Sequence, residues 1–112
     1  MQSKLEALRA MVEADTRARY SADWERDKAR GMDYPLSIHE PQMCVKVKMG
    51  RKYANVDVGS SGRYMVELST GAIYGIKAYG VIHRGHFYGT LDTISEWNWG
   101  GYTASKRQMV TA

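Results

Sequence analysis

The order of apolar and polar positions predicts a helix at the start of the chain. Residues 3–28 contain no Pro or Gly and are rich in Ala, Glu, Arg and Leu, which are strong helix formers. Ser3 and Glu6 have the spacing of a capping box at the first turn. An apolar stripe follows, made of Leu5, Leu8, Met11 and Val12. Gly31 ends the pattern, so we expect one long helix over residues 1–30.

After the helix, the pattern changes to the alternation of β-strands. Residues 31–42 (GMDYPLSIHEPQ) hold both prolines and have no period, which favours a linker. Apolar and polar positions then alternate, with turn residues at Gly50-Arg51, GSSG and STG. This pattern predicts an antiparallel sheet over residues 43–95, with strands at 43–48, 53–58, 63–68, 72–79 and 87–94.

Tyr-Gly occurs three times in the predicted sheet, at 74–75, 79–80 and 88–89. Glycine inside a strand marks a bulge or strong bend, so the sheet is expected to curl into a small, partly open barrel. Residues 96–112 are expected to form an edge strand and a tail. A chain of 112 residues fits a single domain. The predicted fold class is α+β, a long N-terminal helix followed by a curled antiparallel meander of about five strands.

Composition adds a charge asymmetry and excludes several classes of protein. Residues 1–40 hold seven Lys/Arg and eight Asp/Glu, whereas residues 41–112 hold nine and four, which favours an anionic partner for the second part. A basic face kept for solubility is the alternative. Cys44 is the single cysteine, so an intramolecular disulfide is impossible. The sequence has neither an apolar run of membrane-spanning length nor a signal-peptide pattern, and we expect a cytoplasmic protein without membrane contact.

The main functional prediction is a basic, aromatic surface that contacts nucleic acid or a nucleoprotein. Alternation places cations and a tyrosine on one face of the sheet, next to the HRGH segment, where they can neutralise phosphates and stack on bases. The expected contact residues are Lys46, Lys48, Tyr53, Arg63, Lys77, His83, Arg84 and His86. Asp57 and Glu67 share that face and oppose the prediction, and exposed strand lysines also deter aggregation.

The segment HRGHFYGTLDT (83–93) resembles a catalytic or metal site in its residue types. A metal held by His83 and His86 needs a third ligand, for which Asp92, His39 and Cys44 are the available donors. A nuclease could use a histidine as general base, with Arg84 on phosphate and Asp92 or Asp57 orienting the base. No motif joins these groups, and no phosphate loop or dinucleotide fingerprint is present. We therefore expect no enzyme, no metal and no cofactor, with His83–His86 in a glycine-bracketed loop and Leu91 as the core anchor.

Aromatic side chains outside the predicted sheet favour a second class, a protein-binding module. Aromatic residues dominate interface energetics, and the interface candidates are Tyr20, Trp24, Trp97 and Trp99. The alternative for the last two is that one of them caps the core. A homodimer formed through the helix is a third use of the same residues.

Residues 52–93 resemble a segment of small, mostly uncharacterised proteins of phages and plasmids. The residues that carry the resemblance are GRYMVELSTG, IYGIKAYG and YGTLDT. The resemblance implies an accessory protein of a mobile element in the cytoplasm of a bacterial host cell, and assigns no chemistry to any residue. Small accessory proteins of this kind include inhibitors of restriction and CRISPR defences, so an inhibitor of a host defence protein complex is the alternative to nucleic-acid binding.

Overall fold

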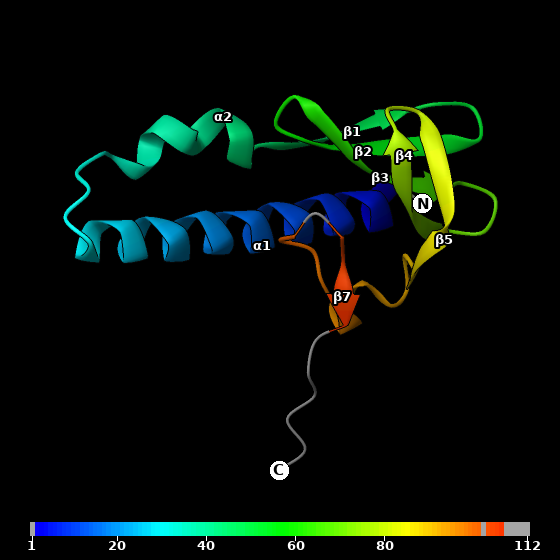
Figure 1. Cartoon of the computed structure of the whole chain (residues 1–112). Coiled ribbons are helices and arrows are strands. Elements are labelled where there is room, and N and C mark those ends of the chain that lie inside the picture. Colours follow the sequence, from blue (N-terminus) through cyan, green and yellow to red (C-terminus); the bar gives the residue numbers. More distant parts are fainter. Residues whose placement is uncertain (1, 102, 107–112) are drawn as a thin grey trace, which may run out of the picture.

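The protein consists of one long helix and a five-stranded antiparallel sheet, in a computed structural model that describes residues 2–101 and 103–106 (Figure 1). The helix is α1 (Gln2–Ala29). The strands, in their order across the sheet, are β1 (Val45–Met49), β2 (Tyr53–Val58), β3 (Ser61–Glu67), β4 (Ala72–Ala78) and β5 (Val81–Thr90). The sheet curls without closing, so the predicted α+β class is confirmed as an open curled sheet.

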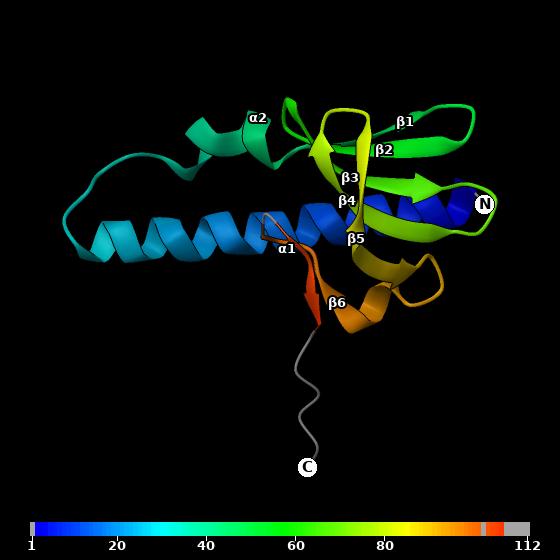
Figure 2. The ribbon, with the colours of Figure 1, turned by 45° about the vertical axis from the view of Figure 1, so that its right-hand side comes forward.

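The N-terminal half of α1 covers one face of the sheet, which we call the inner face. Leu5, Leu8 and Val12 are buried there, as the apolar stripe predicts. They share one core cluster with the inward residues of the strands, among them Val45, Val56 and Val66. The C-terminal half of α1 extends beyond the sheet (Figure 2). The two halves of α1 therefore have different surroundings: the N-terminal half packs on the sheet, and the C-terminal half lies beyond it.

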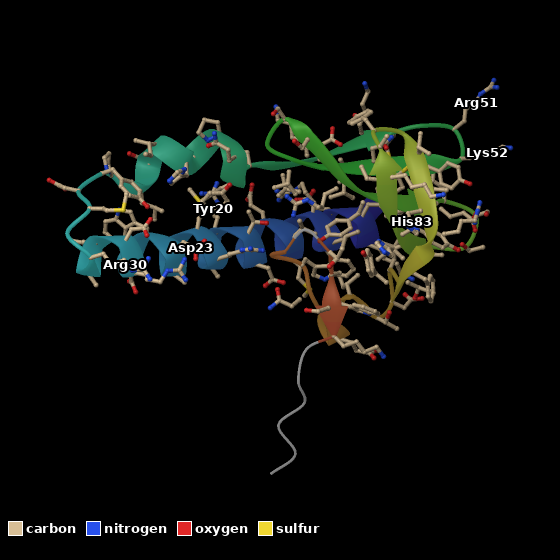
Figure 3. All side chains as sticks on the ribbon, in the orientation of Figure 1. Tyr20, Asp23, Arg30, Arg51, Lys52 and His83 are labelled. Atoms are coloured by element: carbon tan, nitrogen blue, oxygen red, sulfur yellow. The ribbon has the colours of Figure 1, made fainter. Side chains whose placement is uncertain are left out.

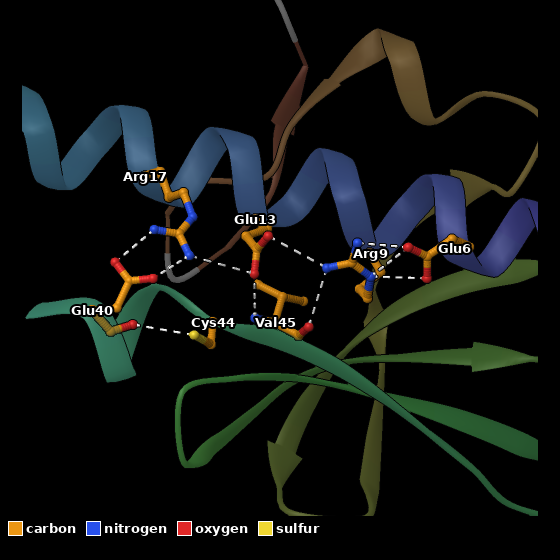
Figure 4. Close-up of polar contacts among 7 residues, drawn as sticks. All are labelled: Glu6, Arg9, Glu13, Arg17, Glu40, Cys44 and Val45. Atoms are coloured by element: carbon orange, nitrogen blue, oxygen red, sulfur yellow. Dashed lines mark hydrogen bonds and ion pairs between the residues drawn. The ribbon is translucent and has the colours of Figure 1, made fainter.

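Side chains of α1 also bind the open edge of β1 (Figure 4). Val45 lies opposite Val58, and its backbone groups point away from β2 toward the helix. Its N–H donates to Glu13 Oε1 at 3.1 Å, and its carbonyl accepts from Arg9 Nη1 at 3.5 Å. Because an edge strand otherwise leaves such groups to water or to another chain, these two bonds fix α1 against β1.

Residues 31–43, which we call the return segment, run back along the C-terminal half of α1. The sequence predicts a linker over residues 31–42, and within this connection the structure forms η1 (Leu36–His39) and α2 (Glu40–Met43). Met43, expected at the start of the first strand, is the last residue of α2. Arg17 holds Glu40 through two bonds of 2.7 and 2.9 Å, and this pairing lowers the pKa of the Glu40 carboxyl. The segment is ordered by polar contacts to α1, which leave no hydrophobic period in the sequence.

Trp99 closes the inner face beside α1, with an exposed fraction of 0%. Its ring packs edge-on against Tyr64 at 5.2 Å between centroids, and its carbonyl accepts from Tyr64 Oη at 3.1 Å. Its N–H donates to Asp15 Oδ2 at 2.9 Å, and Nε1 donates to the Ile94 carbonyl at 3.0 Å. This one residue connects α1, β3 and the segment after β5.

The segment around Trp99 departs from the predicted edge strand of the main sheet. It contains η2 (Ile94–Glu96) and β6 (Trp97–Asn98), and β6 pairs with β7 (Ser105–Lys106) in a separate two-stranded sheet. Residues 102 and 107–112 of the predicted tail lie outside the described residues. The predicted edge strand of the main sheet is thus absent from residues 97–101 and 103–106, because the buried Trp99 places its neighbours against the core.

Replacing Trp99 with alanine is expected to lower the free energy of unfolding by about 3–5 kcal/mol, because the change removes a fully buried ring and its packing. The half-buried neighbour Trp97 is the matched control, and Trp97→Ala should cost at most about 2 kcal/mol. Urea unfolding followed by circular dichroism measures both. Equal losses would show that Trp99 is not the closing residue.

Tyr64 should make the protein sensitive to alkaline pH. Burial raises the pKa of Tyr64 to about 12, above the value of about 10 for an unfolded tyrosine. The neutral phenol is therefore favoured by folding, and its contribution is complete below about pH 10 and lost as pH rises toward about 12. The loss reaches about 2–3 kcal/mol at most.

The variant Tyr64→Phe separates this contribution from the titration of other tyrosines. At about pH 8 it should be less stable than the wild type by about 1 kcal/mol, because the bond to the Trp99 carbonyl is gone. At about pH 11.5 the difference should shrink or change sign, since the variant has no phenol to ionise. A difference that stays constant between the two pH values in urea titrations would contradict the assignment.

Candidate nucleic-acid interface

The face of the sheet that turns away from α1, which we call the outer face, carries half of the predicted contact residues. Residues paired directly across antiparallel strands lie on the same face. The register of the five strands therefore places one row of side chains across the whole outer face: Lys48, Asn55, Met65, Tyr74 and Phe87. Lys46, opposite Asp57, and Tyr53, opposite Glu67, flank this row.

The two ends of the row differ in chemistry. Lys46 and Lys48 are exposed on β1, and Arg51 and Lys52 project at the tip of the β1–β2 hairpin (Figure 3). At the β4–β5 end, the ring of Phe87 lies 5.5 Å from that of Tyr74 and is 51% exposed. The outer face thus has a basic side and an aromatic side.

Arg84 connects these two sides. From β5 its Nη2 donates to Tyr53 Oη on β2 at 3.0 Å, and its guanidinium carbon lies 5.5 Å from the centre of the Tyr74 ring. The Arg84 and Tyr53 side chains together therefore bridge β5 and β2, in the region where Met65 is only 4% exposed. A guanidinium beside aromatic rings can bind a phosphate and stack on a base.

The two acidic groups of the outer face each accept a hydrogen bond, while Asp57 Oδ1 is buried without a hydrogen-bond partner among the described residues. Asp57 Oδ2 accepts from Tyr79 Oη at 3.1 Å, and this bond raises the pKa of Tyr79. Glu67 accepts from Thr70 Oγ1 at 2.7 Å and lies 4.0 Å from the Arg84 guanidinium. Asp57 nevertheless lies directly opposite Lys46, so it reduces the positive charge at the basic end of the face.

Arg63 does not belong to the outer face, contrary to the prediction. Val56 pairs with Tyr64 but Asp57 pairs with Gly62, so β3 carries one extra residue at position 63. This bulge breaks the alternation and sends Arg63 Nη1 to the Gly101 carbonyl, at 2.6 Å. Lys77 also lies apart from the lysines of β1, because it lines a hollow of about 490 Å³ together with Arg63 and His86.

The HRGH segment is part of β5 rather than the loop that the sequence predicts. Tyr74 pairs with Phe87 whereas its neighbour Gly75 pairs with His83, so residues 84–86 bulge out of the ladder. Gly85 allows this geometry, since a Cβ there would lie 3.0 Å from His83 Cε1. Leu91 follows β5 and is buried, as predicted.

The bulge sends Arg84 and the histidines to opposite faces. The rings of His83 and His86 stack at 4.0 Å with planes 5° apart. They lie on the inner side, where a Cβ on Gly75 would meet His86 Cβ at 3.0 Å and Tyr88 Oη at 3.1 Å. The predicted contact set is therefore split: the outer face keeps Lys46, Lys48, Tyr53 and Arg84.

The donors considered for a metal or a catalytic site are not gathered around the histidines. Asp92 bonds Lys4 Nζ at 2.7 Å, and Asp57 lies on the outer face. His39 packs against Tyr20 and Tyr34, and Cys44 Sγ donates to the Glu40 carbonyl at 3.4 Å. Within residues 2–101 and 103–106, no three His, Cys, Asp or Glu side chains form a group that could hold a metal ion.

The aromatic residues predicted to form a protein interface mostly serve the fold. Tyr20 packs on His39 at 5.2 Å, and Trp24 Nε1 donates to the Tyr34 carbonyl at 2.6 Å. Trp99 is fully buried, which excludes it as an interface residue in the folded chain, and Trp97 is half-buried against Tyr88. The alternative that one tryptophan caps the core is confirmed for Trp99.

Sequence reasoning missed four residues of the outer face: Arg51, Lys52, Tyr74 and Phe87. Arg51 and Lys52 lie at a hairpin tip that the turn pattern predicts, so the sequence could have indicated two further cations beside the sheet. The last two share a face with Lys48 only because of the register across β2, β3 and β4. Only the strand pairing reveals that neighbourhood.

Comparison with known proteins finds no matching family model, no matching curated protein and no matching solved structure. In the part of the chain that the structure describes, no helix has the length and apolar character needed to cross a membrane.

Replacing Trp24 with alanine should release the return segment from α1. The change removes both the hydrogen bond from the indole N–H to the Tyr34 carbonyl and the packing of the indole ring. The expected result is faster trypsin cleavage after Arg30, while the sheet keeps its circular dichroism signal. Glu25→Ala, at an exposed position of the same helix, is the matched control. Unchanged cleavage in Trp24→Ala would show that other contacts hold the segment.

Proposed function

We propose that the protein binds single-stranded nucleic acid, free or within a nucleoprotein, through the outer face of its sheet and without catalysis. The observation that carries this proposal is the row across all five strands, which joins Lys48 on β1 to Tyr74 and Phe87 at the opposite side. Arg84 lies over this row and connects the two ends.

The chemistry of the two ends suits a single strand. Lys46, Lys48, Arg51 and Lys52 supply positive charge where a phosphate backbone can follow β1 and its hairpin. Phe87 offers a half-exposed ring on which a base can stack, which is independent of sequence because every base has a π-face. Curled antiparallel sheets commonly bind oligonucleotides in this way.

The resemblance of residues 52–93 to small phage and plasmid proteins supports a role as an accessory protein of a mobile element, acting in the cytoplasm of a bacterial host. The alternative is an inhibitor of a host defence complex that acts through protein contacts. Met32 and Ile38 of the return segment favour it, since each side chain is 53% exposed at the end of α1 far from the sheet.

The double variant Lys46→Glu, Lys48→Glu should lose nucleic-acid affinity by more than about tenfold, because two phosphate contacts become repulsive. Its logarithmic salt dependence should also become less steep by about 1.4, since each contact to a single strand contributes about 0.7. Fluorescence anisotropy with labelled single-stranded and duplex DNA and RNA at several salt concentrations measures both quantities.

Two controls make this experiment specific. The double variant Lys28→Glu, Arg30→Glu makes the same change in charge at the far end of α1. It should change nucleic-acid affinity by less than about threefold. Phe87→Ala should cost about 1–3 kcal/mol of binding, whereas Val81→Ala at the same edge should not. Absence of binding by the wild type at low salt would eliminate the proposal in favour of a protein partner.

A further inference from the structure

The two ends of the row across the outer face lie a fixed distance apart. The row runs from Lys48 on β1 to Phe87 on β5, and these are the two edge strands of the sheet. Five neighbouring strands have four spacings of about 4.8 Å, so the row is about 19 Å long. Stacked nucleotides of one strand rise about 3.4 Å each, so about six of them span this distance.

Of the two rings in this row, Phe87 is the one that is open to a base. Its side chain is 51% exposed. Tyr74 is half-buried, and the guanidinium carbon of Arg84 lies 5.5 Å from the centre of its ring. Tyr53, which flanks the row, is also half-buried, and its Oη accepts a hydrogen bond from the same guanidinium. The protein's own cation therefore occupies the surroundings of both tyrosines, and a base finds a free π-face at Phe87.

The ring of Tyr79, just after β4, is as exposed as that of Phe87, but its surroundings disfavour a nucleotide. Tyr79 Oη donates to Asp57 Oδ2 at 3.1 Å, so a carboxylate is held beside the ring. A carboxylate repels the phosphate that accompanies each base. The ring also lies against Gly62, where a Cβ would be 2.8 Å from Tyr79 Cδ2. Tyr79 is therefore a poor stacking surface for a nucleic-acid strand.

The rest of the row offers contacts that do not depend on a base. Asn55 is half-buried and Met65 is buried, so the middle of the row has neither a cation nor an exposed ring. Lys46 and Lys48 are exposed cations at the β1 end, and cations bind phosphates whatever bases these carry. Asp57 lies opposite Lys46 and reduces the charge there, which leaves Lys48 as the principal phosphate contact of the row. Base contact is thus confined to the β5 end.

We propose that the outer face binds a single-stranded segment of about six nucleotides and stacks the base of one end on Phe87, while the other nucleotides are held through their phosphates. The inference rests on the proposed function and names the length and the base contact that it requires. The bound strand has a fixed direction on the sheet, because its two ends meet different chemistry.

Competition by unlabelled oligothymidylates against a longer labelled one tests the length. The competitors are shorter than, equal to and longer than the row, with about three, six and nine nucleotides. The hexamer should bind at least about tenfold more tightly than the trimer, because only the hexamer reaches both ends of the row. The nonamer should gain less than about threefold over the hexamer. A trimer that binds as tightly as the hexamer would overturn the proposal.

A single abasic nucleotide, placed in turn at each position of the hexamer, locates the base contact. The hexamer suits this test because a strand no longer than the row cannot slide to avoid the lesion. Affinity should fall by at least about fivefold when the lesion is at one end, and by less than about twofold at every other position. Equal penalties at all positions, or no penalty at any position, would contradict the one-ended contact.

The variant Phe87→Ala assigns that contact to its ring. Intact and end-lesioned hexamers should bind this variant equally well, because the stacking surface is gone. Val81→Ala, the matched control at the same edge, should keep the full penalty for the lesion. A structural effect of Phe87→Ala would weaken both hexamers and leave their ratio unchanged, so a ratio that persists in this variant is evidence against the assignment.

The proposed function and this inference fail in different ways. If the wild type binds no oligothymidylate at low salt, both are wrong. If binding is present and weakens steeply as salt rises, but depends neither on length nor on the position of the lesion, the nucleic-acid function stands and the one-ended contact is wrong.

Discussion

The inner face of the sheet is larger than one helix can cover, and the burial of Trp99 resolves that constraint. α1 packs Leu5, Leu8 and Val12 against the sheet before it extends beyond it. The remaining apolar surface around Tyr64 is covered by the indole of Trp99. The polar groups of this residue are all hydrogen-bonded: the backbone N–H donates to Asp15, Nε1 donates to the Ile94 carbonyl, and the backbone carbonyl accepts from Tyr64. An aromatic ring buries a large area with little loss of side-chain freedom, which suits this role.

Two irregularities in the strands decide which chemistry appears on which face. A single extra residue in β3 turns Arg63 inward, and the wide bulge of β5 separates Arg84 from the two histidines next to it. As a result, the outer face receives the cations that stand beside aromatic rings, and the helix side receives those that line hollows. Bulges thus divide one basic sequence between two surfaces with different surroundings.

Much of the architecture could be predicted from the sequence, because helix composition and strict alternation are local signals. Lys46, Lys48 and Tyr53 lie on the expected face since β1 and the start of β2 pair without interruption. Arg63 and the HRGH segment were misplaced because a bulge resets the alternation without any change in residue type. A period of two places Trp97 and Trp99 on the same face of a strand, and only the core shows that Trp99 is the fully buried one. The return segment was missed because ion pairs and hydrogen bonds across 10 or 23 positions leave no period.

The late position of Trp99 in the chain also has a consequence during synthesis. Tyr64 and Trp99 are 35 residues apart, and a ribosome adds about 5–20 residues per second, so roughly 2–7 s pass between them. During that interval Tyr64 lacks the indole ring that packs against it in the finished chain. Chaperones that recognise apolar surface have their opportunity then, and cellular yield depends on how well that short exposure is tolerated.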